Sequence, residues 1–254
     1  MKKLFAVCTA LCLLLVAAGC GKSSNTGTAA VAAGAAHSSI SVEKMNLELT
    51  DRDSDDSYSA DSAVTLSKTD EVLNITAAGT YLVSGTHRQI VVAAPENAKV
   101  QLVLQNVTLT AQNEPAIYVK SADKVFVTLA EQSVNTVSDG GSRQSGQESA
   151  DAAIFSKADL TVNGTGTLKV TGNYKHGIVS KDDLVIANAK LAVTAARHGL
   201  EGQDCLKLSE ADLTVTAGGD ALRSTNEEDE TRGFIVVYSG KYSLTAEQDT
   251  VQAQ

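Results

Sequence analysis

Aliphatic residues alternate with polar ones in short runs along the second half of the chain. Turns rich in Gly, Asn, Ala or Ser separate one run from the next. Alternation with a period of two is typical of β-strands that have one buried face. Four sets of two such strands follow one another, with inward positions at Leu160, Val162, Leu168 and Val170, then Leu184, Ile186, Leu191 and Val193, then Leu206, Leu208, Leu213 and Val215, and finally Ile235, Val237, Tyr242 and Leu244.

These sets recur at a nearly constant interval. Leu184 lies 24 residues after Leu160, and Leu206 lies 22 residues after Leu184. Ile235 follows only after 29 residues, because a polar insertion at residues 224–231 precedes it. A third short strand begins each unit, so the pattern predicts an all-β, single-stranded parallel β-helix, a solenoid of three-strand coils. A β-sandwich is the alternative, and it would place Leu184 and Leu206 on facing sheets.

The N-terminus has the order of a bacterial secretion signal. A positive start is followed by an apolar run, residues 4–16, that is too short to cross a bilayer. Small residues then lead to Cys20. We therefore predict a lipoprotein signal peptide at residues 1–19 and lipidation of the Cys20 thiol, with an ordinary signal peptide cut nearby as the alternative.

Residues 20–41 are rich in Ser, Gly, Ala and Thr and predict a flexible tether, because such a segment cannot bury enough apolar surface to order itself. The domain then spans residues 42–254. This order predicts a secreted protein that is anchored by lipid to the outer face of the cell membrane. Contact with the membrane would be made through that anchor only.

Charge and cysteine content narrow the possible partners. The formal net charge of −9 becomes −11 when the signal peptide takes Lys2 and Lys3 with it. An acidic protein repels nucleic acid and anionic lipid, so we expect no nucleic-acid partner. Cys205 is the one thiol that remains after cleavage and lipidation, which excludes an intramolecular disulfide. We expect a monomer.

Three stretches carry a resemblance to a known family: residues 77–86 (AAGTYLVSGT), 100–107 (VQLVLQNV) and 177–184 (GIVSKDDL). They resemble the bacterial surface proteins with a carbohydrate-binding domain. The resemblance implies a right-handed parallel β-helix that binds calcium and plant cell-wall polysaccharide, including acidic pectin-type chains and cellulose. The chain also ends at Gln254 where a further coil opens, so we expect a domain that is incomplete at its C-terminus.

Aligning the units gives a first column of candidate residues: Ala152, His176, His198, Asp220 and Asp249. The family tends to carry Asp where His176 and His198 stand. One interpretation is a calcium ladder built on Asp220 and Asp249, because calcium prefers oxygen ligands. The alternative is a hydrated polar ladder on a turn. The two histidines would then be solvated, or they would bind a softer metal as a pair.

A second column contains Lys120, Lys157, Lys181 and Gln203, and it is followed by the acids Asp123, Asp159, Asp183 and Asp204. Lysines and aspartates in such a stack can simply neutralise one another. The functional alternative is that Asp182, Asp183 and Asp204 hold calcium while Lys157 and Lys181 face an acidic sugar. Tyr118 and Tyr174 are candidate platforms for sugar rings. The absence of Trp disfavours crystalline cellulose as a ligand.

Three functions follow from these observations. The first is a non-catalytic, calcium-dependent module that binds acidic polysaccharide. The second is an enzyme of the pectate lyase type, with Arg197 or Lys181 as the base, although no arrangement in the sequence is specific for catalysis. The third is a structural surface adhesin whose ligand is a protein.

Overall fold

The computed structural model describes residues 44–67, 71–146 and 149–253. The predicted signal peptide, Cys20 and the predicted tether lie outside the described residues. No helix in the described part is both long and apolar enough to span a bilayer. Two short helical segments precede the strands, α1 (Asp51–Ser54) and η2 (Ala60–Ser62).

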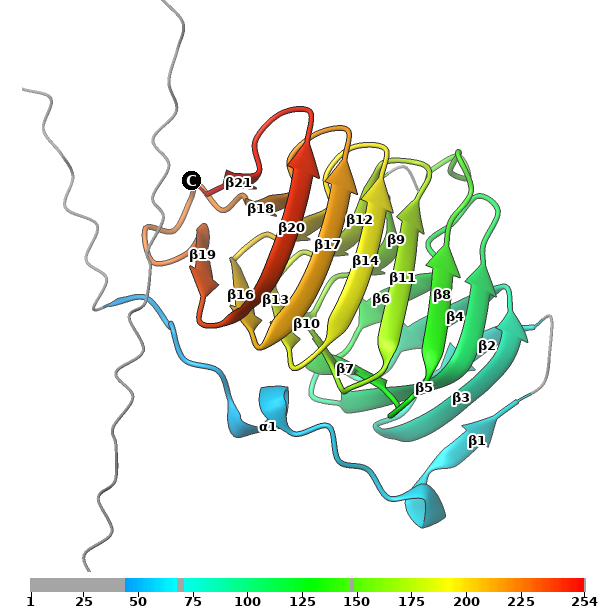
Figure 1. Cartoon of the computed structure of the whole chain (residues 1–254). Helices are drawn as coiled ribbons and strands as arrows, with labels where there is room; N and C mark the ends of the chain where they lie inside the picture. The colour runs from blue at the N-terminus through cyan, green and yellow to red at the C-terminus, as the bar shows by residue number, and fades with distance from the viewer. Residues whose placement is uncertain (1–43, 68–70, 147–148, 254) are drawn as a thin grey trace, which may run out of the picture.

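Two sheets contain all the described strands, and neighbouring strands pair in parallel (Figure 1). The larger sheet has thirteen strands: β1 (Val64–Leu66), β3 (Gly79–His87), β5 (Lys99–Thr110), β7 (Lys124–Leu129), β8 (Val134–Ser138), β10 (Asp159–Asn163), β11 (Thr167–Gly172), β13 (Asp183–Ala187), β14 (Lys190–Ala195), β16 (Cys205–Ser209), β17 (Ala211–Ala217), β19 (Phe234–Val237) and β20 (Gly240–Ala246). The smaller sheet has eight: β2 (Val72–Ile75), β4 (Gln89–Ala93), β6 (Ile117–Ser121), β9 (Ala152–Ser156), β12 (His176–Ser180), β15 (Leu200–Gly202), β18 (Leu222–Ser224) and β21 (Val251–Gln252).

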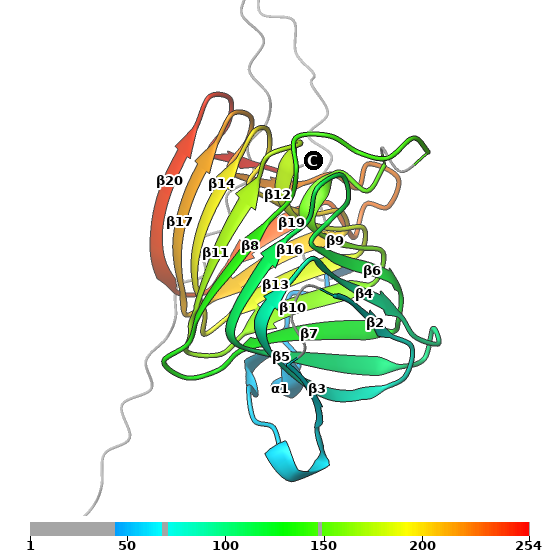
Figure 2. The ribbon, with the colours of Figure 1, turned by 90° about the vertical axis from the view of Figure 1, so that its right-hand side faces the viewer.

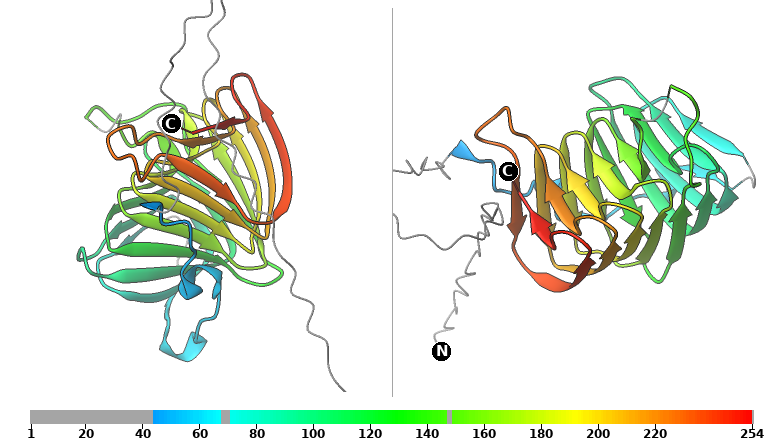
Figure 3. Two further views of the ribbon diagram at one scale, coloured as in Figure 1. Left: turned by 90° about the vertical axis from the view of Figure 1, so that its left-hand side faces the viewer. Right: turned by 90° about the horizontal axis from the view of Figure 1, so that it is seen from above.

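The larger sheet folds back on itself. Its eleven-strand path runs β19-β16-β13-β10-β7-β5-β8-β11-β14-β17-β20, with β5 at the bend. β7 pairs with the first half of β5, and β8 pairs with the last residues of the same strand. The two arms on either side of β5 face a common core, and the eight-stranded sheet lies across it (Figures 2 and 3).

This topology corrects the predicted fold. The predicted right-handed single-stranded parallel β-helix, a solenoid of three-strand coils, is wrong: there are two parallel sheets, and the larger one is nearly closed and barrel-like. The physical reason lies in β5. Asn106 adopts a left-handed backbone conformation (φ 56°) and turns the chain without ending the strand, so two segments that the pattern separates are one strand of twelve residues.

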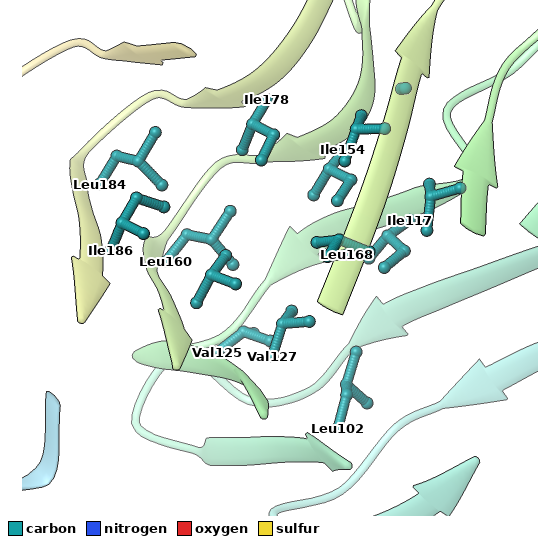
Figure 4. Packing of buried hydrophobic residues seen from close by; sticks show 14 of the residues in the cluster. Leu102, Ile117, Val125, Val127, Ile154, Leu160, Leu168, Ile178, Leu184 and Ile186 are labelled. Carbon is teal, nitrogen blue, oxygen red and sulfur yellow. The ribbon is translucent and has the colours of Figure 1, made fainter. Parts of the chain in front are cut away.

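The predicted alignment of the aliphatic positions is confirmed. Leu160 pairs with Leu184, and Leu184 pairs with Leu206, each time in parallel on adjacent strands. All three side chains are fully buried in one continuous core. Figure 4 shows Leu160 and Leu184 within it. Burial of one such side chain is worth about 1.5–3 kcal/mol. The β-sandwich alternative is excluded, because Leu184 and Leu206 are neighbours in one sheet.

An N-terminal strap, residues 45–55, crosses the outside of one arm of the larger sheet. Met45 and Leu47 pack against the outward side chains of β16 and β19, and α1 contacts β10 and β13. The position of α1 beside the sheet can be seen in Figure 1. Lys207 in β16 donates a hydrogen bond to the carbonyl oxygen of Glu48 (3.1 Å). The strap therefore covers a face that would otherwise be open, and it forms one wall of the site described next.

Candidate functional site

Three carboxylates meet where β10 and β13 begin. Asp159 starts β10, Asp183 starts β13, and Asp182 occupies the turn before it. Leu160 and Leu184 are paired and point inward, so the residues that precede them point outward from adjacent strands about 4.8 Å apart. One oxygen of each of the three carboxylates lies within 4.8 Å of the other two. Among the described residues this is the one group of acids, histidines or cysteines close enough to share a metal ion.

The three acids open into a cleft of about 300 Å³. Its walls come from the strap, from the turns at the starts of the strands, and from the polar insertion before β19. The lining residues are Lys44, Asn46, Asp159, Asp182, Asp183, Asp204, Cys205, Thr231, Arg232 and Phe234. The cleft therefore combines oxygen ligands with two flanking cations.

Electrostatics in the cleft favour an added cation or proton. Burial raises the pKa of Asp182 to about 7, and a hydrogen bond with Asp204 and the charges of the neighbouring acids add to this effect. The pKa of Asp159 is also raised, first by burial and then by the charge of Asp183. Carboxylates at this spacing repel one another unless something positive separates them. The cleft contains the donor type that calcium prefers.

Asp204 lines the same cleft, but its oxygens already have partners. It forms an ion pair with Arg232, and the side-chain amide of Asn226 donates to it (2.6 Å). Lys207 Nζ lies 3.6 Å from Asp183 Oδ2, so the lysine partly compensates the negative charge of that carboxylate. The cleft thus brings together three residues predicted as metal ligands, Asp182, Asp183 and Asp204, and adds Asp159.

The other two predicted ligands, Asp220 and Asp249, lie in the first column and not in the cleft. Their column forms a ladder of side-chain acceptors and backbone donors. The backbone N–H of His198 donates to His176 Nδ1 (3.2 Å), and that of Asp249 donates to Asp220 Oδ1 (3.1 Å). Between them, the backbone nitrogen of Asp220 lies 2.9 Å from His198 Nδ1.

This ladder explains why histidine can replace aspartate at these positions. Imidazole Nδ1 and a carboxylate oxygen both offer a lone pair to the backbone N–H of the next strand. The rings of His176 and His198 stack with centroids 4.9 Å apart and planes 7° apart. Burial, together with the neighbouring His176, lowers the pKa of His198 to about 4, so this imidazole is neutral at pH 7.

Three of the four residues predicted to bind carbohydrate, Tyr118, Lys157 and Lys181, lie along the outer face of the eight-stranded sheet. Tyr118 packs edge-to-face on Phe155, with ring centroids 5.9 Å apart. Lys181 reaches over the same Phe155 ring, and its Nζ lies 3.4 Å from Glu201 Oε1. Lys157 is exposed in the turn after β9, next to the turn that carries Lys181. Lys181 and Asp182 are consecutive, so this face and the acidic cleft meet at one turn.

Tyr174 lies outside this row. The guanidinium of Arg143 stacks over its ring at 4.5 Å from the centroid, and Lys175 lies 5.1 Å from the same centroid. Such contacts are cation–π interactions that use the ring face within the protein. Tyr118 has a similar contact with Lys120, whose Nζ lies 5.2 Å from its ring centroid, and both tyrosines are partly buried.

Sequence reasoning missed a second cleft. It measures about 720 Å³ and lies between the segment after α1 and the turn after β7; Tyr58, Thr128, Glu131, Gln132 and Thr165 are among its lining residues. Tyr58 is an exposed aromatic there, at 37%. Nothing in the local pattern indicated it, because its two walls are far apart in the sequence.

Comparison with known proteins shows which family the chain belongs to. The model of the family described as carbohydrate-binding domain-containing protein matches residues 69–254. The chain belongs to this family. The carbohydrate-binding domain covers both sheets from β2 onward, so the predicted partner class, a carbohydrate, is confirmed at this level.

One relative within the carbohydrate-binding domain family comes from Acetivibrio thermocellus. It is 36% identical over 203 residues, which cover 78% of this chain and 71% of the relative. A solved structure described as the polysaccharide lyase-like protein from C. thermocellum, in a gadolinium derivative, is also similar. It has a TM-score of 0.69 and 26% sequence identity, with 76% of this chain and 88% of that chain covered. The family description names binding, whereas the structural neighbour is described by its likeness to lyases.

Proposed function

We propose that this protein is a non-catalytic module that binds acidic polysaccharide of the polygalacturonate or pectin type, and that binding requires calcium. The observation that carries the proposal is the group of Asp159, Asp182 and Asp183 carboxylates directly beside the lysine-bearing turn at Lys181. One surface thus offers both metal ligands and a cation to a polyanion.

Calcium would supply the link between two acidic partners. The ion takes six to eight oxygen ligands at about 2.3–2.6 Å. The three aspartates provide only part of such a shell, which leaves positions for carboxylates of a uronate chain. Without the ion, a protein with a net charge of −9 repels a polyuronate.

The outer face of the eight-stranded sheet would hold the sugar rings. Tyr118 lies half-buried there, and the ammonium group of Lys120 lies 5.2 Å from its ring centroid. Lys157 and Lys181 occupy adjacent turns along the same edge. Aromatic and cationic side chains in one row suit a ligand with apolar ring faces and negative carboxylates.

The sequence at Cys20 supports display of this module on the outer face of the cell membrane through a lipid anchor. The monomeric state is a separate part of the proposal. Membrane fractionation tests the lipid anchor. The native chain is expected in the membrane fraction, and Cys20→Ser is expected in the soluble fraction. Equal partitioning of the two forms would contradict the anchor.

Affinity gel electrophoresis tests the function itself. Migration of the protein is measured in gels with polygalacturonate, with a neutral glucan, or with neither, in the presence of calcium or of a chelator. We expect retardation only with polygalacturonate plus calcium. Retardation that persists in chelator would refute the calcium requirement, and no retardation in either gel would favour a protein-binding adhesin.

A polysaccharide lyase is the second candidate, because the similar solved structure is described as lyase-like. The absorbance of unsaturated uronate, followed with polygalacturonate and calcium, separates the two. We expect no product at catalytic protein concentrations. Steady product formation that scales with protein would replace the binding module by an enzyme.

A further inference from the structure

Arg223 stands out on the outer face of the eight-stranded sheet as a cation with an unused hydrogen-bonding capacity. It lies in β18, between Leu222, which is buried in the core, and Ser224. Arg223 pairs in register with Glu201 of β15, and Glu201 pairs with Val179 of β12. The arginine therefore continues the outward row that contains Phe155 and Tyr118.

The guanidinium lies against the His198 ring. Arg223 Nη1 lies 2.7 Å from His198 Nε2. A neutral imidazole accepts only one hydrogen bond, so His198 accepts either from Arg223 or from the backbone N–H of Asp220. In either case the guanidinium, which has five N–H groups, uses at most one of them within the part of the chain that the structure describes.

No carboxylate in the described structure takes up the remaining donors. The nearest acid is Asp220, with 3.8 Å between Arg223 Nε and Asp220 Oδ2. That distance is too long for a hydrogen bond. Asp220 is occupied by its own column, where its other oxygen accepts the backbone N–H of Asp249. Arg223 Nε has no hydrogen-bond partner although it is buried.

The side chain is nevertheless reachable from solvent, with 26% of it exposed. Neutral His198 adds no negative charge beside the guanidinium, and the Asp220 carboxylate, 3.8 Å from Nε, compensates its charge only in part. Lys181 lies on the other side of Glu201 and points to the same row. Two cations thus flank the Glu201 carboxylate, while Val179 and Phe155, which separate it from Tyr118 in this row, are buried.

We propose that Arg223 is a carboxylate-binding residue of this face and that it recognises the C6 carboxylate of a uronic acid in an extended polysaccharide. This inference rests on the proposed function and adds a specificity-determining residue to it. Arginine suits the role because its planar fork can donate two parallel hydrogen bonds to one carboxylate. A sugar whose carboxylate is esterified would lose most of this interaction.

The test compares Arg223→Gln with the native chain in affinity gels with polygalacturonate, at saturating calcium. We expect binding at least tenfold weaker, since a hydrogen bond to a charged group is lost. Arg223→Lys keeps the charge without the fork and is expected to bind with intermediate affinity. Arg88→Gln, an exposed arginine between β3 and β4, removes the same charge elsewhere and serves as the matched control.

Calcium titration and thermal unfolding of Arg223→Gln show whether the cleft and the fold are intact; both are expected to match the native chain. Methyl-esterified pectin should bind the native chain and Arg223→Gln equally weakly. If the native chain binds polygalacturonate and Arg223→Gln binds equally well, the role of Arg223 is refuted while the proposed function stands. If the native chain does not bind, the proposed function itself fails.

Discussion

Asp53 and Asp182 lie on the same outer side of the larger sheet but in opposite electrostatic situations. Burial would raise the pKa of Asp53, but hydrogen bonds from Lys124, Thr161 and Thr50 outweigh it and lower that pKa. Lys124 Nζ lies 2.7 Å from Asp53, and Thr161 donates to it at 2.5 Å. Asp182 meets other carboxylates instead, and its pKa rises to about 7.

The difference between Asp53 and Asp182 shows that the charge of the neighbouring groups, and not burial, determines whether an acid on this surface is structural or available to a ligand. Asp53 is paired with Lys124 of β7 and accepts a hydrogen bond from Thr161 of β10, so it attaches the strap to both strands. Asp182 shares a cleft with acids whose charges are only partly compensated, so the cation must come from outside. The first residue is structural, and the second is a candidate for ligand binding.

The largest expected effect is on stability and separates the two acids most clearly. Asp53→Ala leaves the Lys124 ammonium, whose side chain is only 12% exposed, without this partner and should lower the free energy of unfolding by about 3 kcal/mol. Urea unfolding measures it. Asp51→Ala, at an exposed position one residue before Arg52 in the same α1, is the control and should change little. A similar loss in both variants would mean that the strap is held by its backbone.

Calcium should stabilise the fold by binding to the acids of the cleft, and not by binding to the strap. At a calcium concentration 100 times the dissociation constant, the native chain should gain about 2.7 kcal/mol in unfolding free energy, and a chelator should remove the gain. Asp182→Asn should abolish it. Asp123→Asn, an exposed acid in the turn before β7, should keep it. Loss of the calcium effect in both variants would place the ion elsewhere.

The two acids should respond to pH in opposite directions. A folded-state pKa of about 7 for Asp182, against 3.8 unfolded, gives stability that is present below about pH 4 and lost as pH rises through 7. The lowered pKa of Asp53 gives stability that is present above 3.8 and lost as pH falls through its folded value. Urea unfolding of Asp182→Asn, measured from about pH 4 to 7, should lack the loss of stability with rising pH that is assigned to Asp182. An unchanged pH profile in that variant would contradict the assignment.

The smallest effect concerns the cation beside the cleft. Arg232 forms an ion pair with Asp204 and lines the cavity. Arg232→Gln makes the cleft more negative and should tighten calcium binding by a factor of about 1.5–5, because half-exposed ion pairs are worth about 0.2–1 kcal/mol. Isothermal titration calorimetry measures the change, with Arg88→Gln as the control. Weaker binding would show that Arg232 organises the acids instead of competing with calcium.

The sequence allowed the alignment of strands to be predicted, but not how the sheets join. The interval between Leu160, Leu184 and Leu206 is enough to place these residues side by side, because parallel neighbours keep a constant register. The bend at Asn106 has no such signal. Whether a strand ends or continues there depends on pairing with both β7 and β8, which the local pattern does not contain.

The candidate site was predictable to a similar degree. Asp182, Asp183 and Asp204 follow from the alignment, and the structure brings them to one cleft. Asp159 belongs to the same predicted column. The sequence alone could not distinguish a metal ligand at this position from an aspartate whose charge is neutralised by a lysine of the stack. The role of Asp53 was hidden because Thr161, its partner, lies 108 residues away.

The most direct test of the central claim is an anomalous-scattering map from a crystal soaked in calcium or a lanthanide. We predict one strong peak between the carboxylates of Asp159, Asp182 and Asp183, and loss of that peak in Asp182→Asn. A peak at Asp220 and Asp249 with none in the cleft, or no peak at saturating calcium, would contradict it.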